Sequence, residues 1–176
     1  QIPNEKIILG KKAIRFEQTA DIITVSFDDE STVKCKYLLI ADGVKSPLRQ
    51  QLLPHSTPRY SGYTCWRATI DNSSIKLDKG SETWGKDGRF GMTPLVGNRI
   101  YWYACVNSKA NNAIYRNYSV KDLKTHFQDY HTTIPTILAE TRDVDLIWND
   151  IIDIKPLTHL AYGNILLLGD AGHATT

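Results

Sequence analysis

Hydrophobic and polar residues alternate along the first part of the chain in the manner of β-strands. Ile14 and Phe16 alternate with charged residues, and a similar run covers 23–27. A period of two with one polar face is typical of a strand whose other face is buried. The polar run 28–31 predicts a turn before a third strand. The first forty residues are therefore expected to form a β-meander.

Two short runs lack this alternation and are apolar throughout. Residues 37–41 lead into Asp42-Gly43, and residues 165–168 lead into Gly169-Asp170. A continuous apolar run is typical of a strand buried on both faces. A carboxylate directly after such a strand lies at the carboxyl end of the sheet, where open α/β sheets bind their ligands. We therefore expect the chain to enter one nucleotide-binding sheet twice, with another domain between.

The segment between these runs is predicted to form an antiparallel sheet with flanking helices. Strands are expected at 63–70 and 100–106, and Asp87-Gly88 and Gly97-Asn98 are turn signals. Because both faces of 100–106 carry bulky side chains, we expect packing on each face. Capping residues and apolar stripes predict three helices, at 47–53, 119–130 and 135–141. A further strand is expected at 151–157, before the apolar run at 165–168.

These elements predict an α+β or α/β fold in two parts. Residues 1–54 and 158–176 would form part of a doubly wound domain, and residues 55–157 an antiparallel β-sheet domain with helices. Because the chain begins with Gln rather than Met, we interpret it as an internal fragment.

Composition and charge exclude several classes of partner. With 41% hydrophobic residues the chain can build a core, and 21 basic against 19 acidic side chains give a net charge of +2. This balance, without basic runs, argues against a nucleic-acid partner, and no apolar stretch is long enough to span a bilayer. Cys35, Cys65 and Cys105 form no C-x-x-C pair, so we interpret them as small core residues in a reducing, cytoplasmic protein.

Either acidic turn alone has a simple explanation as a strand end followed by a loop. The functional interpretation is that Asp170 accepts hydrogen bonds from hydroxyls of a bound nucleotide cofactor, while Ala171 and Gly172 let that cofactor approach the backbone. Similarly, Asp42-Gly43 could be only a turn before a capped helix. Both turns together, each after an apolar strand, are more specific for a cofactor site.

These two segments resemble a known enzyme family. Residues 38–49, around Asp42-Gly43, resemble the Asp-Gly motif of single-component FAD-dependent aromatic hydroxylases, the para-hydroxybenzoate hydroxylase-like monooxygenases. Residues 166–174 resemble the Gly-Asp motif of that family. The strand at 63–67, Pro94-Leu95 and the strand at 99–102 also resemble its substrate domain. The likeness is to the branch with salicylate hydroxylase, urate hydroxylase and zeaxanthin epoxidase.

The resemblance implies a role for each matching position. Asp170 would hold the ribityl chain of FAD, and Gly169 and Ala171 would lie against the cofactor. Asp42, Gly43 and Arg49 would lie near the flavin pyrophosphate and the route of NADH or NADPH. The antiparallel sheet would cover the flavin and shape the substrate pocket with four side chains: Trp66, Arg67, Trp102 and Tyr103. No metal site and no catalytic side chain is implied.

The implied reaction is hydroxylation or epoxidation of a small organic, aromatic substrate. NAD(P)H would reduce the flavin, and molecular oxygen would add to it as a flavin hydroperoxide. The family's Gly-x-Gly-x-x-Gly unit is absent from this sequence, so the isolated fragment is expected to be inactive.

Three alternatives remain open on the residues alone. One is a related FAD-dependent reductase or halogenase, and another is a non-catalytic β-rich binding module. The third is a metal hydrolase built on Asp170 and His173, which lacks any supporting H-E-x-x-H spacing.

Overall fold

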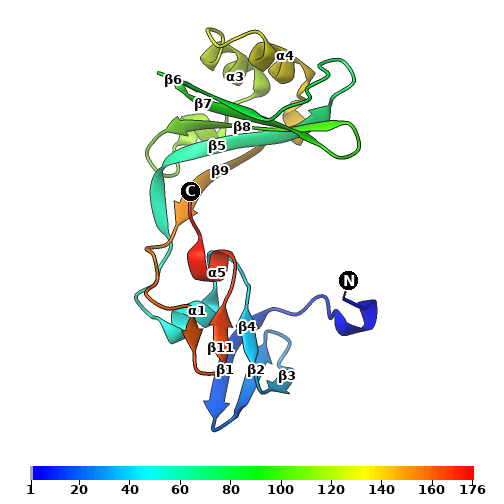
Figure 1. Cartoon of the computed structure of the whole chain (residues 1–176). Coiled ribbons are helices and arrows are strands. Elements are labelled where there is room, and N and C mark those ends of the chain that lie inside the picture. Colours follow the sequence, from blue (N-terminus) through cyan, green and yellow to red (C-terminus); the bar gives the residue numbers. More distant parts are fainter. Residues whose placement is uncertain (1) are drawn as a thin grey trace. The chain divides into compact units, whose positions relative to one another are not determined.

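The computed structural model describes residues 2–176, which divide into two compact units (Figure 1). The first unit runs to Arg59 and also contains Ile152–Thr176; the second is Tyr60–Ile151. The boundaries expected from the sequence lay at 54/55 and 157/158. The structural boundary at Arg59 coincides with the start of a long strand, which supplies the sheet of the second unit from its first residues. The functional assignment of the two parts remains a prediction.

The first unit contains two three-stranded sheets. One is the expected meander, in the order β1-β2-β3, and the other has the order β10-β11-β4. The elements of this unit are η1 (Asn4–Lys6), β1 (Ala13–Thr19), β2 (Ile22–Phe27), β3 (Thr32–Cys35), β4 (Leu38–Ile40), α1 (Pro47–Leu52), β10 (Ala161–Tyr162), β11 (Ile165–Leu167) and α5 (Asp170–His173).

A single core joins the two sheets of the first unit. Phe16 and Ile23 from the meander pack in one buried cluster with Ile40 of β4, Leu48 of α1 and Leu167 of β11. The helix α1 begins as expected: Ser46 Oγ accepts a hydrogen bond from the Arg49 backbone N–H at 2.9 Å, and Pro47 is the first helical residue.

The expectation that both apolar runs are buried on two faces is wrong. Tyr37 and Leu39 are 73% and 61% exposed, and Leu168 is also exposed. Within the first run, the strand β4 begins at Leu38 and belongs to a different sheet from β3, which ends at Cys35. In this unit, only one face of β4 and β11 is covered by the core, so an apolar run did not distinguish one buried face from two.

The second unit is a five-stranded sheet with helices, in the order β6-β7-β8-β5-β9. Its expected hairpin turns are confirmed, and both Gly97 and Asn98 have positive φ angles, as a primed turn requires. The elements are β5 (Arg59–Asp71), β6 (Ser81–Gly85), β7 (Gly88–Leu95), β8 (Arg99–Asn107), α2 (Ala113–Arg116), α3 (Val120–His126), α4 (Thr133–Glu140), η2 (Asp143–Asp145) and β9 (Ile147–Asp153).

One face of this sheet forms the core under α3 and α4. Trp66, Phe90 and Trp102 are fully buried there, and Phe90 stacks on Trp102 with ring centroids 5.2 Å apart. Phe127, just after α3, meets Phe90 edge-on at 5.7 Å. Trp102 Nε1 donates a hydrogen bond to Thr141 Oγ1 at 3.0 Å. Apart from the buried Cys65 and Cys105, the opposite face carries mostly half-buried side chains, so within this unit the helices pack on one face only.

Several boundaries differ from expectation. The capping box of α3 is confirmed, with Ser119 and Asp122 bonded reciprocally, but the helix ends at His126 rather than near 130. The strand expected at 151–157 is β9, which runs from Ile147 to Asp153 and so begins and ends earlier than expected. The short elements α2, β10 and α5 were not expected. No helix among residues 2–176 is both long and apolar enough to cross a membrane.

Candidate functional site

The two acidic turns lie at the same edge of one sheet. Strands β4 and β11 are parallel neighbours, with Leu38 opposite Ile165 and Ile40 opposite Leu167. The Leu168 backbone N–H continues the pairing by donating to the Ile40 carbonyl at 2.8 Å. Because neighbouring parallel strands end at the same edge, the Asp-Gly and Gly-Asp turns both follow that edge. The convergence expected from the sequence is therefore present.

The backbone leaves both turns open toward solvent. Asp42 and Asp170 are exposed, and Gly43 and Gly169 have φ angles of 88° and 54°. A Cβ at either glycine would meet nothing within 4 Å, so it is the positive φ that favours glycine at these positions. The first residue of α5 is Asp170, which places its carboxylate immediately after the strand.

The small residues after Asp170 serve packing. Ala171 and Gly172 are buried, and a Cβ at Gly172 would lie 3.0 Å from the Leu167 carbonyl oxygen. The expectation that these two residues admit a ligand is therefore not supported by their positions. Their size instead lets α5 lie close against the end of β11.

Arg49 ties the two turns together from inside the unit. The side chain is 0% exposed and donates to three backbone carbonyls, those of Val44 at 2.6 Å, Ser56 at 3.3 Å and Ala171 at 3.1 Å. Burial lowers the pKa of Arg49, and the nearby Asp42 carboxylate opposes that shift. An arginine stays protonated under such conditions. Arg49 therefore positions both turns, and its guanidinium is occupied within the protein.

The four side chains expected in the substrate pocket lie on opposite faces of the second unit's sheet. Trp66 and Trp102 belong to the core under the helices, so the expectation that they line a pocket is corrected. Arg67 and Tyr103 are directly opposite each other on β5 and β8, and both are half-buried on the other face. Alternation along a strand separates its two faces, but it did not reveal which face the helices cover.

Arg89 and Glu82 extend this open face, and the sequence reading missed them. Arg89 lies opposite Cys105 in the register, on the face of Arg67. Its guanidinium lies 5.0 Å from the Tyr63 ring centroid, bonds to the Tyr63 hydroxyl at 3.0 Å, and has its Nε 3.7 Å from a Glu82 carboxylate oxygen. The signal available in the sequence was that Arg89 is the one charged residue of the strand 88–95.

Tyr103 is held in its neutral form on this face. Its hydroxyl donates to Glu82 Oε1 at 2.9 Å. Burial, and then this bond to a carboxylate, raise the pKa of Tyr103 to about 12. The open face therefore offers fixed cationic guanidinium groups, one carboxylate and a protonated phenol.

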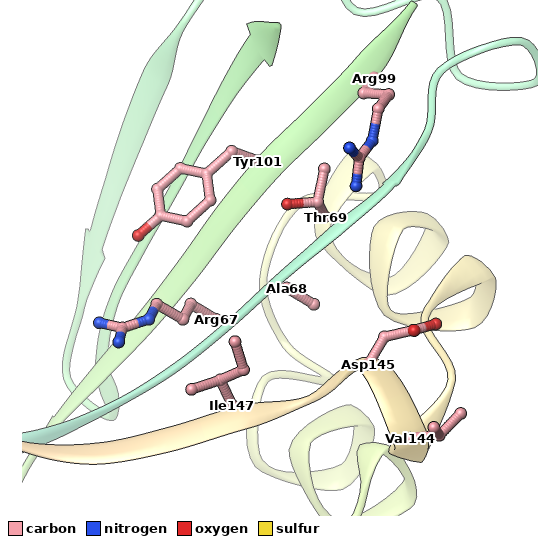
Figure 2. Close-up of a pocket in the computed structure, with 8 residues that line it drawn as sticks. All are labelled: Arg67, Ala68, Thr69, Arg99, Tyr101, Val144, Asp145 and Ile147. Carbon is pink, nitrogen blue, oxygen red and sulfur yellow. The ribbon is translucent and has the colours of Figure 1, made fainter. Parts of the chain in front are cut away.

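A pocket opens at the end of this sheet beside η2 (Figure 2). Its volume is about 390 Å³, and two arginines, Arg67 and Arg99, lie along it with Tyr101. Arg67 Nη2 also donates to Asn149 Oδ1 at 2.9 Å. On the far wall Asp145 is held by Arg142 at 2.6 Å, which lowers the pKa of that carboxyl. The pocket suits a polar or anionic small molecule.

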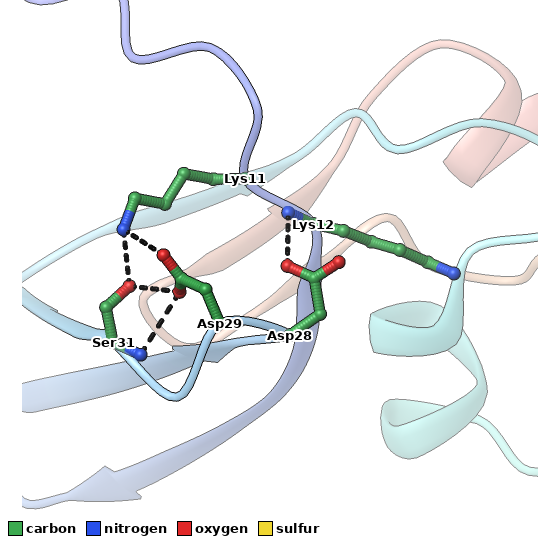
Figure 3. A network of polar contacts seen from close by, with 5 residues as sticks. All are labelled: Lys11, Lys12, Asp28, Asp29 and Ser31. Atoms are coloured by element: carbon green, nitrogen blue, oxygen red, sulfur yellow. Dashed lines mark hydrogen bonds and ion pairs between the residues drawn. The ribbon is translucent and has the colours of Figure 1, made fainter.

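The first unit has an apolar pocket of about 440 Å³ whose lining includes Asp42. Val25, Leu39 and Ile40 supply part of the lining, and Lys11 lies on its edge. Lys11 is fixed by hydrogen bonds to Asp29 and Ser31 in the turn after β2 (Figure 3). The Lys11 ammonium is the main cause that lowers the pKa of Asp29 to about 2. Among residues 2–176 no group of three or more His, Cys, Asp or Glu side chains is placed to hold a metal ion.

Comparison with known proteins gives matches along nearly the whole chain. The family model described as FAD binding domain matches residues 12–176. The aurachin C monooxygenase/isomerase of Stigmatella aurantiaca is 32% identical over 176 residues, covering 99% of this chain and 46% of the relative. The FAD-dependent urate hydroxylase of Klebsiella pneumoniae is 31% identical over 175 residues, with 98% and 46% covered. This chain thus spans about half the length of these relatives.

Solved structures agree with these matches. The crystal structure of Klebsiella pneumoniae HpxO complexed with FAD and uric acid superposes with a TM-score of 0.88 at 30% identity, covering 99% of this chain and 46% of that one. A salicylate hydroxylase substrate complex shares the fold with a TM-score of 0.72 at 22% identity, with 94% and 46% covered. With paired acidic turns at one sheet edge and a family match over residues 12–176, the chain belongs to the FAD binding domain family of flavoprotein hydroxylases and monooxygenases.

Proposed function

We propose that this chain supplies part of the FAD site and part of the substrate site of an NAD(P)H-using monooxygenase. The reaction would hydroxylate or epoxidise a small organic, aromatic substrate with molecular oxygen. The observation that carries the proposal is the parallel pairing of β4 with β11, which brings Asp42 and Asp170 to one edge. Relatives named as monooxygenases and hydroxylases support the reaction class.

The residues at this edge fit a hydroxyl-rich cofactor such as FAD. Two exposed carboxylates can accept hydrogen bonds from ribityl or ribose hydroxyls, and such charge-assisted bonds are strong. The open space at Gly43 and Gly169 admits a ligand to the backbone. The apolar pocket that Asp42 helps to line offers a surface for the non-polar part of a nucleotide.

The chemistry that FAD supplies when bound is electron transfer from NADH or NADPH and activation of oxygen. The chain's own residues would bind and orient the cofactor and the substrate. Arg49 holds the two turns at fixed separation, so that Asp42 and Asp170 meet the cofactor in a preformed arrangement. On the open sheet face, Arg67 and the protonated Tyr103 are suited to orient a polar or anionic aromatic substrate.

The first experiment tests the role of Asp170 in FAD retention. We expect Asp170→Ala in the protein as the cell makes it to weaken FAD binding by roughly 10- to 150-fold, since a hydrogen bond to a charged group contributes about 1.5–3 kcal/mol. The measurement is bound-flavin absorbance per protein, followed by titration with FAD. The matched control is Asp21→Ala, an exposed aspartate between β1 and β2. Normal FAD occupancy in Asp170→Ala would contradict the assigned role.

The second experiment tests the reaction. Oxidation of NADH and of NADPH, together with oxygen uptake, is measured with and without candidate aromatic substrates such as urate, salicylate and 6-hydroxynicotinate. A monooxygenase shows faster NAD(P)H oxidation with its substrate and an oxygenated product. Equal oxidation with every compound and no oxygenated product would favour a reductase instead. Absence of bound flavin would favour a binding module.

A further inference from the structure

Two cysteines face each other on adjacent strands of the second unit. Cys65 on β5 lies directly opposite Cys105 on β8, and both are free thiols. They are 5% and 6% exposed, on the sheet face opposite the helix-covered core. Directly opposite residues in an antiparallel pair have Cα atoms about 4.5–5.5 Å apart, which lies inside the range of about 4.4–6.8 Å that disulfides span. The backbone register therefore already suits a cross-strand disulfide.

The surroundings make the two thiols unequal. Cys105 lies between Cys65 on one neighbouring strand and Arg89 on the other. The neighbouring Cys65 thiol is the main influence that lowers the pKa of Cys105 to about 7, and the Arg89 guanidinium lowers it further against the effect of burial. The neighbouring Cys105 thiol and burial raise the pKa of Cys65, whose own S–H donates to the Trp66 carbonyl at 3.4 Å. Cys105, which lies beside the Arg89 guanidinium, is therefore the more acidic of the two thiols.

We propose that Cys65 and Cys105 form a peroxide-oxidisable dithiol, in which Cys105 reacts first and Cys65 closes a cross-strand disulfide. The site goes beyond the proposed monooxygenase function and does not depend on it, because the oxidant is named here as hydrogen peroxide. The third cysteine, Cys35, lies at the end of β3 in the other unit and has no such neighbour among the described residues.

The chemistry balances in two steps. The Cys105 thiolate attacks one oxygen of hydrogen peroxide, the O–O bond breaks, and the other oxygen leaves as hydroxide, which leaves Cys105 as a sulfenic acid. The Cys65 sulfur then attacks the sulfenic sulfur, the S–S bond forms, and the sulfenic oxygen leaves as water with the Cys65 proton. Two thiols are oxidised by two electrons, and one peroxide becomes two molecules of water.

Oxidation would alter the open sheet face. The disulfide removes the anionic sulfur beside Arg89, on the face that also carries Arg67 and Tyr103. After oxidation, the acidic group that remains beside the Arg89 guanidinium is Glu82, whose Oε1 lies 3.7 Å from Arg89 Nε. The charge balance of this face therefore depends on the redox state of the pair.

The experiment treats the purified protein with increasing hydrogen peroxide, blocks remaining thiols by alkylation, and measures intact and peptide masses. We expect loss of two hydrogen atoms, alkylation at Cys35 alone, and a linked peptide joining Cys65 to Cys105. The rate should rise with pH about a midpoint near 7, where an ordinary thiol would show about 8.5. A disulfide that involves Cys35, or oxidation of all three cysteines at one rate, would overturn the proposal.

Serine variants separate the two roles. Cys65→Ser should stop at a sulfenic acid on Cys105 that dimedone traps, and Cys105→Ser should form no disulfide within this unit. Cys35→Ser is the matched control and should form the same disulfide as the unmodified protein. Dimedone trapping on Cys65 rather than on Cys105 in the unmodified protein would contradict the assignment of the reacting thiol. If a variant does not fold, the peptide masses of the unmodified protein still show whether Cys65 and Cys105 form the disulfide.

Discussion

Replacing the buried arginine between the two turns is the sharpest structural test. Arg49→Met keeps much of the side-chain volume but removes all the donors to the carbonyls of Val44, Ser56 and Ala171. Hydrogen bonds from a charged group contribute about 1.5–3 kcal/mol each, and release of a buried charge offsets part of their loss. Removing one partner of a buried charged contact typically destabilises by about 3–5 kcal/mol. We expect a loss in this range.

Urea unfolding followed by circular dichroism measures this loss, and thermal unfolding gives a second value. For a chain of this size about 3–5 kcal/mol corresponds to a fall in Tm of roughly 6–20 °C. Hydrogen exchange of the Leu168 amide, which bonds to Ile40, localises the effect to the paired strand ends.

The matched control is Arg15→Met in the same unit. The Arg15 side chain is 63% exposed and, among residues 2–176, its ion pair is with the exposed Glu17, so its loss should change stability by less than about 1 kcal/mol. If Arg49→Met is no more destabilising than this control and leaves Leu168 protected, Arg49 does not hold the turns together.

Two further predictions concern the second unit. Trp102→Phe should destabilise the protein by about 1 kcal/mol more than Trp66→Phe. The reason is that Trp102 loses a hydrogen bond to Thr141, whereas the buried Trp66 Nε1 has no partner among the described residues. Urea unfolding of both variants measures the difference. Ser119→Ala should destabilise by about 1 kcal/mol at neutral pH through loss of the helix cap. The Ser119 hydrogen bonds lower the pKa of Asp122, so the charged cap stabilises above the ordinary carboxyl pKa and is lost as the pH falls through the lower folded value. The difference between Ser119→Ala and the unmodified protein should therefore shrink in acid, and a constant difference would refute the coupling.

The sequence was a good guide where the signal was local. Alternating residues located the meander and β8, and Ser119 with Asp122 marked the start of α3. The prediction that the two acidic turns lie at one edge of a sheet was also correct, because each aspartate comes just after an apolar strand in the sequence. These features depend on neighbours in the chain, on strand period and on capping chemistry.

The remaining features depend on contacts between distant segments, which one sequence does not display. A charged residue is expected at the surface, and the sequence around Arg49 contains no pattern that predicts its burial against Ala171. The apolar side chain of Leu39 did not reveal that its face would be open. Trp66 gave no sign of which sheet face the helices would cover. The elements α2, β10 and α5 span at most four residues, too few to show a period.

The bond between Arg49 and Ala171 also bears on the order in which the chain can fold. The donor emerges from the ribosome more than a hundred residues before its acceptor. Until Ala171 is synthesised, the nascent first unit lacks both this acceptor and strand β11. Most of the second unit is translated in between, so the paired turns can be completed only after the second unit has been synthesised.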